Sequence, residues 1–222
     1  RGLGDVYKRQ GWKNNEQKGT PDMKYYISDL HLFHENAIKF DNRPFSSIPE
    51  MHDAILKNWN DRVTNGDYVY ILGDVSMRGK NEDLIAFVAK LKGRKVLVRG
   101  NHDDVSDYRY QQLFAEICDY KEIYDSIGKE KYGLVLCHYP IFSWKKMGRG
   151  KILLYGHTHE SEEDRFYQQC LDQMQESDCR HVYNHQLRAY NVGCMLPYMN
   201  YTPRTLGEIM EQAGERNETL KK

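Results

Sequence analysis

The sequence predicts one α/β domain, and three observations lead to this conclusion. Short runs rich in Val, Ile, Leu and Tyr, typical of buried strands, alternate with stretches whose apolar residues recur at helical spacing. A chain of 222 residues suits one sizeable domain and is too short for two large ones. Several predicted strands end on Asp, Asn or His, as in α/β proteins that bind ligands at the carboxyl edge of a sheet.

Charge and cysteine content exclude several classes of protein. Lys and Arg number 32, as do Asp and Glu, so the formal net charge is zero and a broadly basic nucleic-acid surface is not expected. No apolar run is long enough to span a membrane, so no membrane partner is expected. The five cysteines form no C-x-x-C pair, and no secretory signal is recognisable. We therefore expect reduced thiols and a cytoplasmic location.

The first 22 residues do not resemble part of a folded domain. They are polar and Gly-rich and have the periodicity of neither helix nor strand. We expect residues 1–22 to be a disordered or non-native leader. Met23 directly precedes the first predicted strand, so the single domain is expected over residues 23–222.

Apolar runs bounded by Gly, Pro and Asp mark the strands. They predict strands at residues 25–27, 68–72, 95–98, 118–124, 133–137, 151–155 and 189–193.

Helices are expected between these strands. Ser47 and Glu50 form a capping box that opens a helix ending near Val63. Further helices are expected at residues 82–92 and, more briefly, at 108–116. Residues 160–188 carry more charge and a weaker pattern, which predicts a surface excursion containing a helix at 165–175. Thr202 and Pro203 are expected to cap a C-terminal helix within residues 202–222.

The ends of the predicted strands carry the chemistry. Asp29 and His31 follow the first strand two positions apart, so in extended backbone both side chains point to the same side. Later strands end on Asp74, on Asn101 with His102, on His138, and on His157 with His159. Carboxylates, imidazoles and an amide oxygen, without a thiolate, suit Mn²⁺, Fe²⁺ or Zn²⁺. These candidate ligands exceed what one open catalytic ion needs and suit two ions that share one carboxylate.

Taken together, the motifs D-x-H, G-D, G-N-H-D, H and G-H-x-H, in this order, resemble those of the calcineurin-like metallophosphoesterase superfamily. The resemblance extends over about residues 23–193 and is strongest to small bacterial and phage phosphoesterases, through the run at residues 40–45. It implies a four-layer α/β/β/α sandwich of two mixed β-sheets flanked by helices. It also implies two metal ions at one edge of the sheets.

The resemblance assigns a role to each matching residue. One metal would be held by Asp29, His31 and His159, the other by Asn101, His138 and His157, with Asp74 bridging them. His102 would lie beside the leaving group, with Asp103 orienting its ring. The implied activity is hydrolysis of a phosphomonoester or phosphodiester by in-line attack of a metal-bridging hydroxide, with His102 as general acid. A small phosphorylated substrate is expected, and a nucleotide is one candidate.

Some alternatives remain open at the level of sequence. A nuclease or a nucleotide pyrophosphatase of the same superfamily would share these motifs, and so would a non-catalytic interaction module on the same fold. His34 lies just past the first motif and either faces the site or is solvated. Arg43 either clamps a phosphate or forms a salt bridge within its loop.

Overall fold

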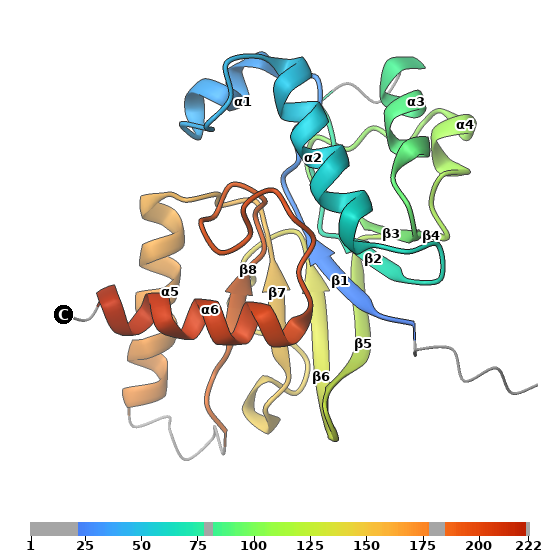
Figure 1. Ribbon diagram of the computed structural model, residues 1–222. Helices are drawn as coiled ribbons and strands as arrows, with labels where there is room; N and C mark the ends of the chain where they lie inside the picture. The colour runs from blue at the N-terminus through green and yellow to red at the C-terminus, as the bar shows by residue number, and fades with distance from the viewer. Residues whose placement is uncertain (1–21, 78–81, 178–184, 221–222) are drawn as a thin grey trace, which may run out of the picture.

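Two four-stranded sheets form the centre of the computed structural model, which describes residues 22–77, 82–177 and 185–220 (Figure 1). The first sheet has the order β1-β2-β3-β4, with strands at Lys24–Ile27, Tyr68–Ile71, Arg94–Val98 and Glu116–Cys118. The second has the order β5-β6-β7-β8, with strands at Tyr120–Ile127, Glu130–Cys137, Ile152–Tyr155 and Ala189–Asn191. The predicted α/β architecture of two sheets flanked by helices is confirmed. The expected leader, apart from Asp22, lies outside the described residues, as do residues 178–184 of the expected excursion.

The two sheets differ in strand direction. All three pairs of neighbouring strands in the first sheet are parallel, with Tyr25 opposite Val69 and Leu97 opposite Ile117. In the second sheet β5 and β6 form an antiparallel hairpin, while β6, β7 and β8 run parallel. Only the second sheet is therefore mixed. The first is wholly parallel because a helical crossover, rather than a tight turn, separates each of its consecutive strands.

The chain passes from one sheet to the other at Asp119. The single strand expected at 118–124 is in fact two strands, β4 in the first sheet and β5 in the second. Backbone bonds also join the sheets beyond the end of β1, where Ser28 N donates to Val192 O and Cys194 N donates to Ser28 O. The segments that follow β1 and β8 are thereby held side by side.

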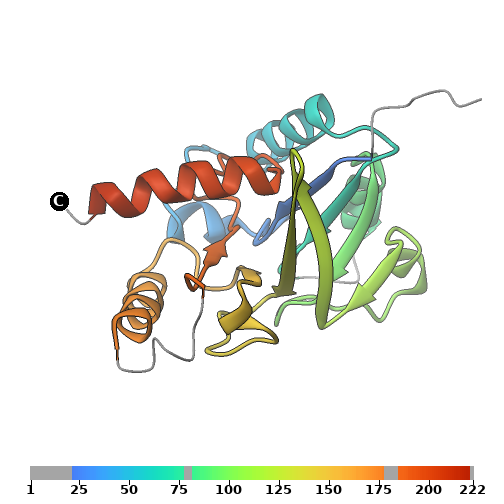
Figure 2. The ribbon, with the colours of Figure 1, turned by 90° about the horizontal axis from the view of Figure 1, so that it is seen from below.

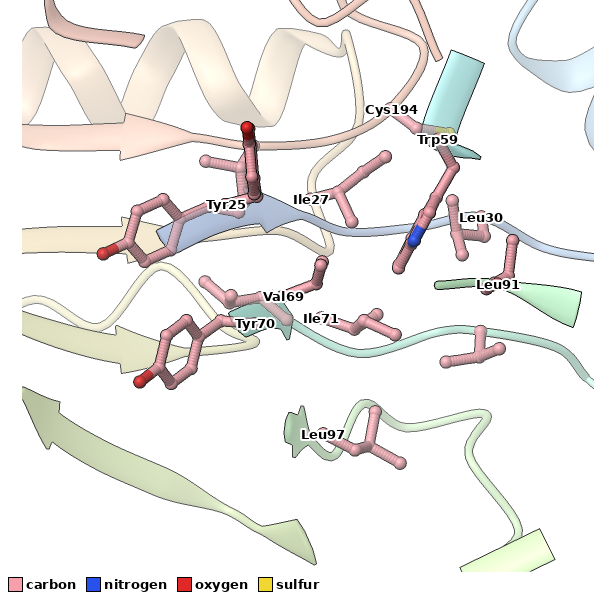
Figure 3. Close-up of a cluster of buried hydrophobic side chains, with 14 of the residues drawn as sticks. Tyr25, Ile27, Leu30, Trp59, Val69, Tyr70, Ile71, Leu91, Leu97 and Cys194 are labelled. Atoms are coloured by element: carbon pink, nitrogen blue, oxygen red, sulfur yellow. The ribbon is translucent and has the colours of Figure 1, made fainter. Parts of the chain in front are cut away.

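Helices α2 and α3 cover the first sheet. They span Ile48–Arg62 and Glu82–Lys90, and α4 at Tyr108–Gln111 is shorter than expected. The predicted cap of α2 is present, because the Ser47 side chain accepts from Glu50 N. Trp59 of α2 is fully buried in the cluster that includes Ile71 and Leu91, and its Nε1 donates to Lys92 O (Figure 3).

Helix α5, at Glu162–Glu176, packs on the outer face of the second sheet. Alternate residues of β6 and β7 point to opposite faces: Leu136 and Leu154 belong to the large core, whereas Val135 and Leu153 pack with Leu171 of α5. The helix expected at 165–175 is confirmed, but it is longer than expected and packs on the sheet instead of belonging to an irregular surface excursion. Burial of each large apolar side chain on this face stabilises the fold by about 1.5–3 kcal/mol.

Helix α6, at Leu206–Leu220, contacts β1, β5 and β8. Its first turn is capped by Thr205 rather than by the expected Thr202, because Thr205 Oγ1 accepts from Glu208 N while the Glu208 carboxylate accepts from Thr205 N. Arg62 of α2 forms a 2.6 Å ion pair with Glu208. Figure 2 shows the two helices along the same side of the molecule.

Candidate metal centre

The carboxyl ends of strands from both sheets bring the predicted ligands together. One group comprises Asp29, His31 and His159, and a second comprises Asp74, His138 and His157. Within each group the candidate ligand atoms all lie within 4.8 Å of one another. The seventh predicted ligand, Asn101, joins the second group, with its Oδ1 3.1 Å from His138 Nε2.

Asp74 lies between the two groups. Its Oδ2 is 3.8 Å from His31 Nε2 and 3.6 Å from His138 Nε2. Asp74 is only 2 % exposed and Asp29 is fully buried. Among the described residues, no Lys or Arg side chain forms an ion pair with either carboxylate, and buried carboxylates need a cationic or metal partner.

The imidazoles complete a donor set that fits divalent cations. His31 Nε2 lies 3.0 Å from His159 Nε2, and His159 Nε2 lies 3.6 Å from Asp29 Oδ1. Nitrogen and oxygen donors that converge in this way, with no sulfur among them, suit Mn²⁺, Fe²⁺ or Zn²⁺.

Most of the ligands adopt an unusual backbone conformation. The φ angle is positive at Asp29 (56°), His31 (47°), Asp74 (53°), His157 (70°) and His159 (51°). The left-handed region costs a non-glycine residue about 1–3 kcal/mol, so it persists only where the surrounding structure enforces it. Here backbone bonds enforce it, because Asp29 N donates to Gly73 O and His31 N donates to Asp74 O, each at 3.0 Å. The extended backbone expected at Asp29 and His31 is therefore wrong, although both side chains belong to the same ligand group.

Two glycines make room for the ligands. Gly73 has a φ of +87°, and a Cβ there would lie 2.3 Å from His138 Nδ1. A Cβ on Gly156 would lie 2.5 Å from Asp29 Oδ2. Both positions therefore require glycine, as the sequence motifs G-D and G-H-x-H suggest.

Burial shifts the protonation of the ligands. Burial, assisted by the neighbouring His159, lowers the pKa of His31 to about 2, which keeps its imidazole neutral and ready to bind a cation. Burial also lowers the pKa of His157 and raises that of Asp29. Burial lowers the pKa of His159 too, but the hydrogen bond to Asp41 and the charge of Asp29 outweigh it, so the pKa is raised.

Asp41 is part of the site that sequence reasoning missed. Its Oδ1 lies 2.6 Å from His159 Nδ1, and its Oδ2 accepts from Arg43 Nε and Nη2. A carboxylate on the far nitrogen of a metal-binding histidine fixes the tautomer and orientation of the ring. The run Asp41-Asn42-Arg43 contains this carboxylate, but the sequence alone favours Arg43 as its functional residue.

Comparison with known proteins agrees with this geometry. A family model described as calcineurin-like phosphoesterase matches residues 25–186. The chain belongs to the calcineurin-like phosphoesterase family. Such phosphoesterases typically bind two divalent metals, and the structure has two candidate ligand groups. Family and site together support a metal-dependent hydrolase of phosphoesters.

Individual relatives come from Methanocaldococcus jannaschii, a mycobacterial phage and Aquifex aeolicus. The uncharacterized protein MJ1445 of Methanocaldococcus jannaschii is 34% identical over 143 residues, which cover 64% of this chain and 72% of that protein. The Gene 66 protein of Mycobacterium phage L5 is 28% identical over 160 residues, covering 61% and 76% of the two chains. A solved structure, the protein of unknown function AQ665 from Aquifex aeolicus, shares the fold with a TM-score of 0.59 and 24% identity. It covers 86% of this chain and 99% of its own.

Arg43 does not face the site. Its guanidinium is fully buried and donates to Asp41, to Leu30 O at 2.8 Å and to Asp29 O at 3.0 Å. Of the two roles expected for Arg43, the salt bridge within its loop is confirmed, and the phosphate clamp is wrong because these donors all bond to protein groups. Arg43 instead holds the end of β1 and the Asp41 carboxylate in place.

The expected role of Asp103 also needs correction. Its carboxylate accepts from the backbone N–H groups of Asp74, Val75 and Gly100, at 2.8, 2.9 and 2.8 Å. Burial raises its pKa. Asp103 therefore ties the loop after β2 to the loop after β3, rather than orienting the His102 ring.

A cavity of about 230 Å³, here called the central cavity, opens beside the ligands. His102 and His34 both line it, together with Phe40 and Met77. The backbone N–H of His102 donates to Asp74 Oδ1 at 3.0 Å, and its ring centre lies 5.9 Å from that of His31. His102 and His34 line the cavity and belong to neither ligand group.

A buried polar network supports the G-H-x-H turn from the outer side. Asp164 of α5 is 6 % exposed, and its Oδ1 accepts from Tyr155 OH at 2.7 Å, from Thr158 Oγ1 at 3.0 Å and from Asn191 Nδ2 at 2.9 Å. Asn191 Nδ2 also donates to His159 O at 2.9 Å. Sequence reasoning missed this network because Asp164 lies in the segment expected to be a surface excursion.

Within the described ranges, no helix has both the length and the apolar character needed to cross a membrane.

Proposed function

We propose that this protein hydrolyses a phosphoester bond with the help of two divalent cations. The observation that carries the proposal is the position of Asp74 Oδ2, 3.8 Å from a nitrogen of one ligand group and 3.6 Å from a nitrogen of the other. A buried carboxylate in this position can serve two ions at once. Family membership supplies the class of reaction.

The ligand assignment follows from the two groups. One ion would be held by Asp29, His31 and His159. The other would be held by Asn101, His138 and His157, and Asp74 would contribute to both sites. When bound, such a pair lowers the pKa of a water molecule and neutralises charge on phosphate oxygens. Mn²⁺, Fe²⁺ and Zn²⁺ all suit this mixture of imidazoles and carboxylates.

Side chains outside the ligand groups would donate a proton and contact the substrate. His102 lines the central cavity outside the ligand groups, so its imidazole would give a proton to the leaving alkoxide. The bond from its own N–H to Asp74 fixes the backbone of His102 relative to the ligands. His34 lines the same cavity and would contact the substrate, a small phosphorylated molecule.

The test combines metal content with turnover of aryl phosphoesters in Mn²⁺. The protein should take up about two ions per chain, and Asp74→Asn should lower kcat by at least about a hundredfold, because the ion pair loses its shared carboxylate. Asp53→Asn, an exposed change on α2, is the matched control and should leave both unchanged. Full activity of Asp74→Asn would contradict the proposal. Uptake of two ions without turnover of any ester would favour a non-catalytic interaction module.

A further inference from the structure

The rings of the candidate histidine ligands are held in different ways. His138 Nδ1 lies 2.8 Å from Leu72 O, and His159 Nδ1 lies 2.6 Å from Asp41 Oδ1. A metal-binding histidine normally has such a partner on its other ring nitrogen, which fixes the orientation of the ring. His157 differs, because among the described residues its hydrogen bonds involve only its backbone and none reaches its imidazole.

A tyrosine ring packs against His157 instead. Tyr139 directly follows His138 after β6, and its ring centre lies 4.7 Å from that of His157, with 60° between the ring planes. The ring of Tyr139 also lies 5.0 Å from that of His138, and the two imidazoles lie 5.1 Å apart. All three pairs are edge-to-face, a favourable geometry for aromatic rings at separations of about 4.5–7 Å.

The backbone brings Tyr139 to His157. Gly156 N donates to His138 O at 2.9 Å, and this bond joins the turn after β7 to the segment after β6. Tyr139 and His157 are the next residues along the two segments. Their rings therefore meet although the residues are far apart in the sequence.

Tyr139 contributes little to the core of the protein. Its side chain is 43 % exposed, and it belongs to neither buried hydrophobic cluster. Within the described residues, its aromatic contacts are with the two imidazoles of the second ligand group. Substitution of so exposed a side chain should leave the fold intact, so its effect on the metal centre can be measured separately.

We propose that Tyr139 is a positioning residue whose ring holds the imidazole of His157 in the orientation that binds the cation of the second ligand group. This inference rests on the proposed function, because it needs an ion at that group. A ring contact restrains rotation of the imidazole without using a ring nitrogen, so the nitrogen near Asp74 and His138 remains available to the ion. Asp29, His31 and His159, which form the first group, do not depend on this contact.

Titration calorimetry of the full chain with Mn²⁺ tests the proposal. Tyr139→Ala should raise the Kd of one of the two sites by about tenfold and leave the other within about twofold. Tyr139→Phe keeps the ring and should bind both ions as the unaltered protein does. Tyr124→Ala removes a tyrosine of similar exposure (52 %) from β5 and should change neither Kd. Circular dichroism checks the fold, and Tyr139→Leu, which keeps apolar bulk without a ring, should weaken the same site as Tyr139→Ala.

A double-mutant cycle identifies the affected site. Once His157→Ala has removed the imidazole, adding Tyr139→Ala should change Mn²⁺ affinity by less than about twofold, because no ring is left to hold. Unchanged affinity in Tyr139→Ala, an equal loss in Tyr139→Phe, or additive losses in the double variant would overturn the inference and leave the proposed function intact. Failure of the unaltered protein to bind two ions would instead overturn the proposed function.

Discussion

His159 Nδ1 and Asp41 Oδ1 lie 2.6 Å apart, and this contact links the ring of a candidate metal ligand to the loop that follows α1, at Glu35–Phe40. Asp41 is held in turn by Arg43, whose other donors grip the carbonyl groups of Asp29 and Leu30. The Arg43 guanidinium thereby fixes both the end of β1 and the orientation of His159. The positions of two ligands of the same group, Asp29 and His159, therefore depend on the buried guanidinium of Arg43.

Replacing Asp41 by Asn should weaken metal binding without removing a ligand. The variant keeps the shape of the side chain but loses the charge that orients His159, and such changes cost about 10- to 100-fold in metal affinity. Titration calorimetry with Mn²⁺ measures the effect, and circular dichroism checks the fold. Asp61→Asn, on the exposed side of α2, is the control. Equal Mn²⁺ affinity in the two variants would show that Asp41 does not support His159.

Adding one methyl group at Gly156 should also disturb the centre. A Cβ there would lie 2.5 Å from both Asp29 Oδ2 and Ser28 Oγ, so the ligand would have to move. We expect Gly156→Ala to lower Mn²⁺ affinity by more than about tenfold and to cost about 1–3 kcal/mol in the free energy of unfolding.

Gly66→Ala is the matched control for this change. A Cβ at Gly66 would make an ordinary contact of 3.4 Å with Asp22 Oδ1, far from the ligands. If urea denaturation and Mn²⁺ titration give the same values for both alanine variants, the close approach of Gly156 to Asp29 is not needed for stability or for metal binding.

The ligands could be found from the sequence because each of them is marked by the residues next to it in the chain. Each follows directly after a strand, and parallel strands bring their carboxyl ends to one edge. The glycines beside them signal sharp turns, and the structure gives Asp74 and His157 the left-handed backbone that such turns need. Local sequence therefore contained the ligand types and the turns at Asp74 and His157, but not the left-handed backbone of Asp29 and His31, which was expected to be extended.

The phosphate clamp expected of Arg43 and the role expected for Asp103 were wrong because the positions of these side chains depend on contacts between residues that are far apart in the sequence. A long side chain such as Arg43 can reach several partners, and only the packed structure shows that carbonyl groups take its donors. Asp103 likewise binds backbone groups of a loop about 30 positions earlier in the chain. Helix α5 was underestimated because Tyr167 and Leu171 make a narrow apolar face among charged neighbours, with Phe166 on the exposed side.

Removing the carboxylate of Asp164 should lower the metal affinity of the centre, because Asn191 connects Asp164 to His159. Asp164→Ala leaves Thr158, Tyr155 and Asn191 without a shared acceptor, at a cost of about 1–3 kcal/mol in the free energy of unfolding. Because Asn191 also holds His159 O, Mn²⁺ affinity should fall as well. Glu176→Ala, an exposed change on the same helix, should change neither quantity. Lost stability with unchanged Mn²⁺ affinity would limit the network to a structural role.

Acid should weaken the attachment of β1 through Asp67. The Asp67 carboxylate accepts from Met23 N at 2.9 Å, from Thr64 N at 2.7 Å and from Thr64 Oγ1 at 2.8 Å. Burial raises its pKa, but the hydrogen bonds from Thr64 and Met23 outweigh burial, so the folded-state pKa is lowered. The stabilisation is therefore complete above the unfolded pKa of about 3.9 and is lost as pH falls through the folded value.

We expect Asp67→Asn to lower the free energy of unfolding by about 1–3 kcal/mol at pH 7, because an amide cannot accept all three hydrogen bonds. The difference from the unaltered protein should shrink as pH falls from about 5 toward 3, since protonation removes the same carboxylate from the unaltered chain. Urea denaturation across this pH range measures both quantities, with Asp61→Asn as an exposed control. A difference that stays constant, or grows, on acidification would mean that the charge of Asp67 does not fasten β1.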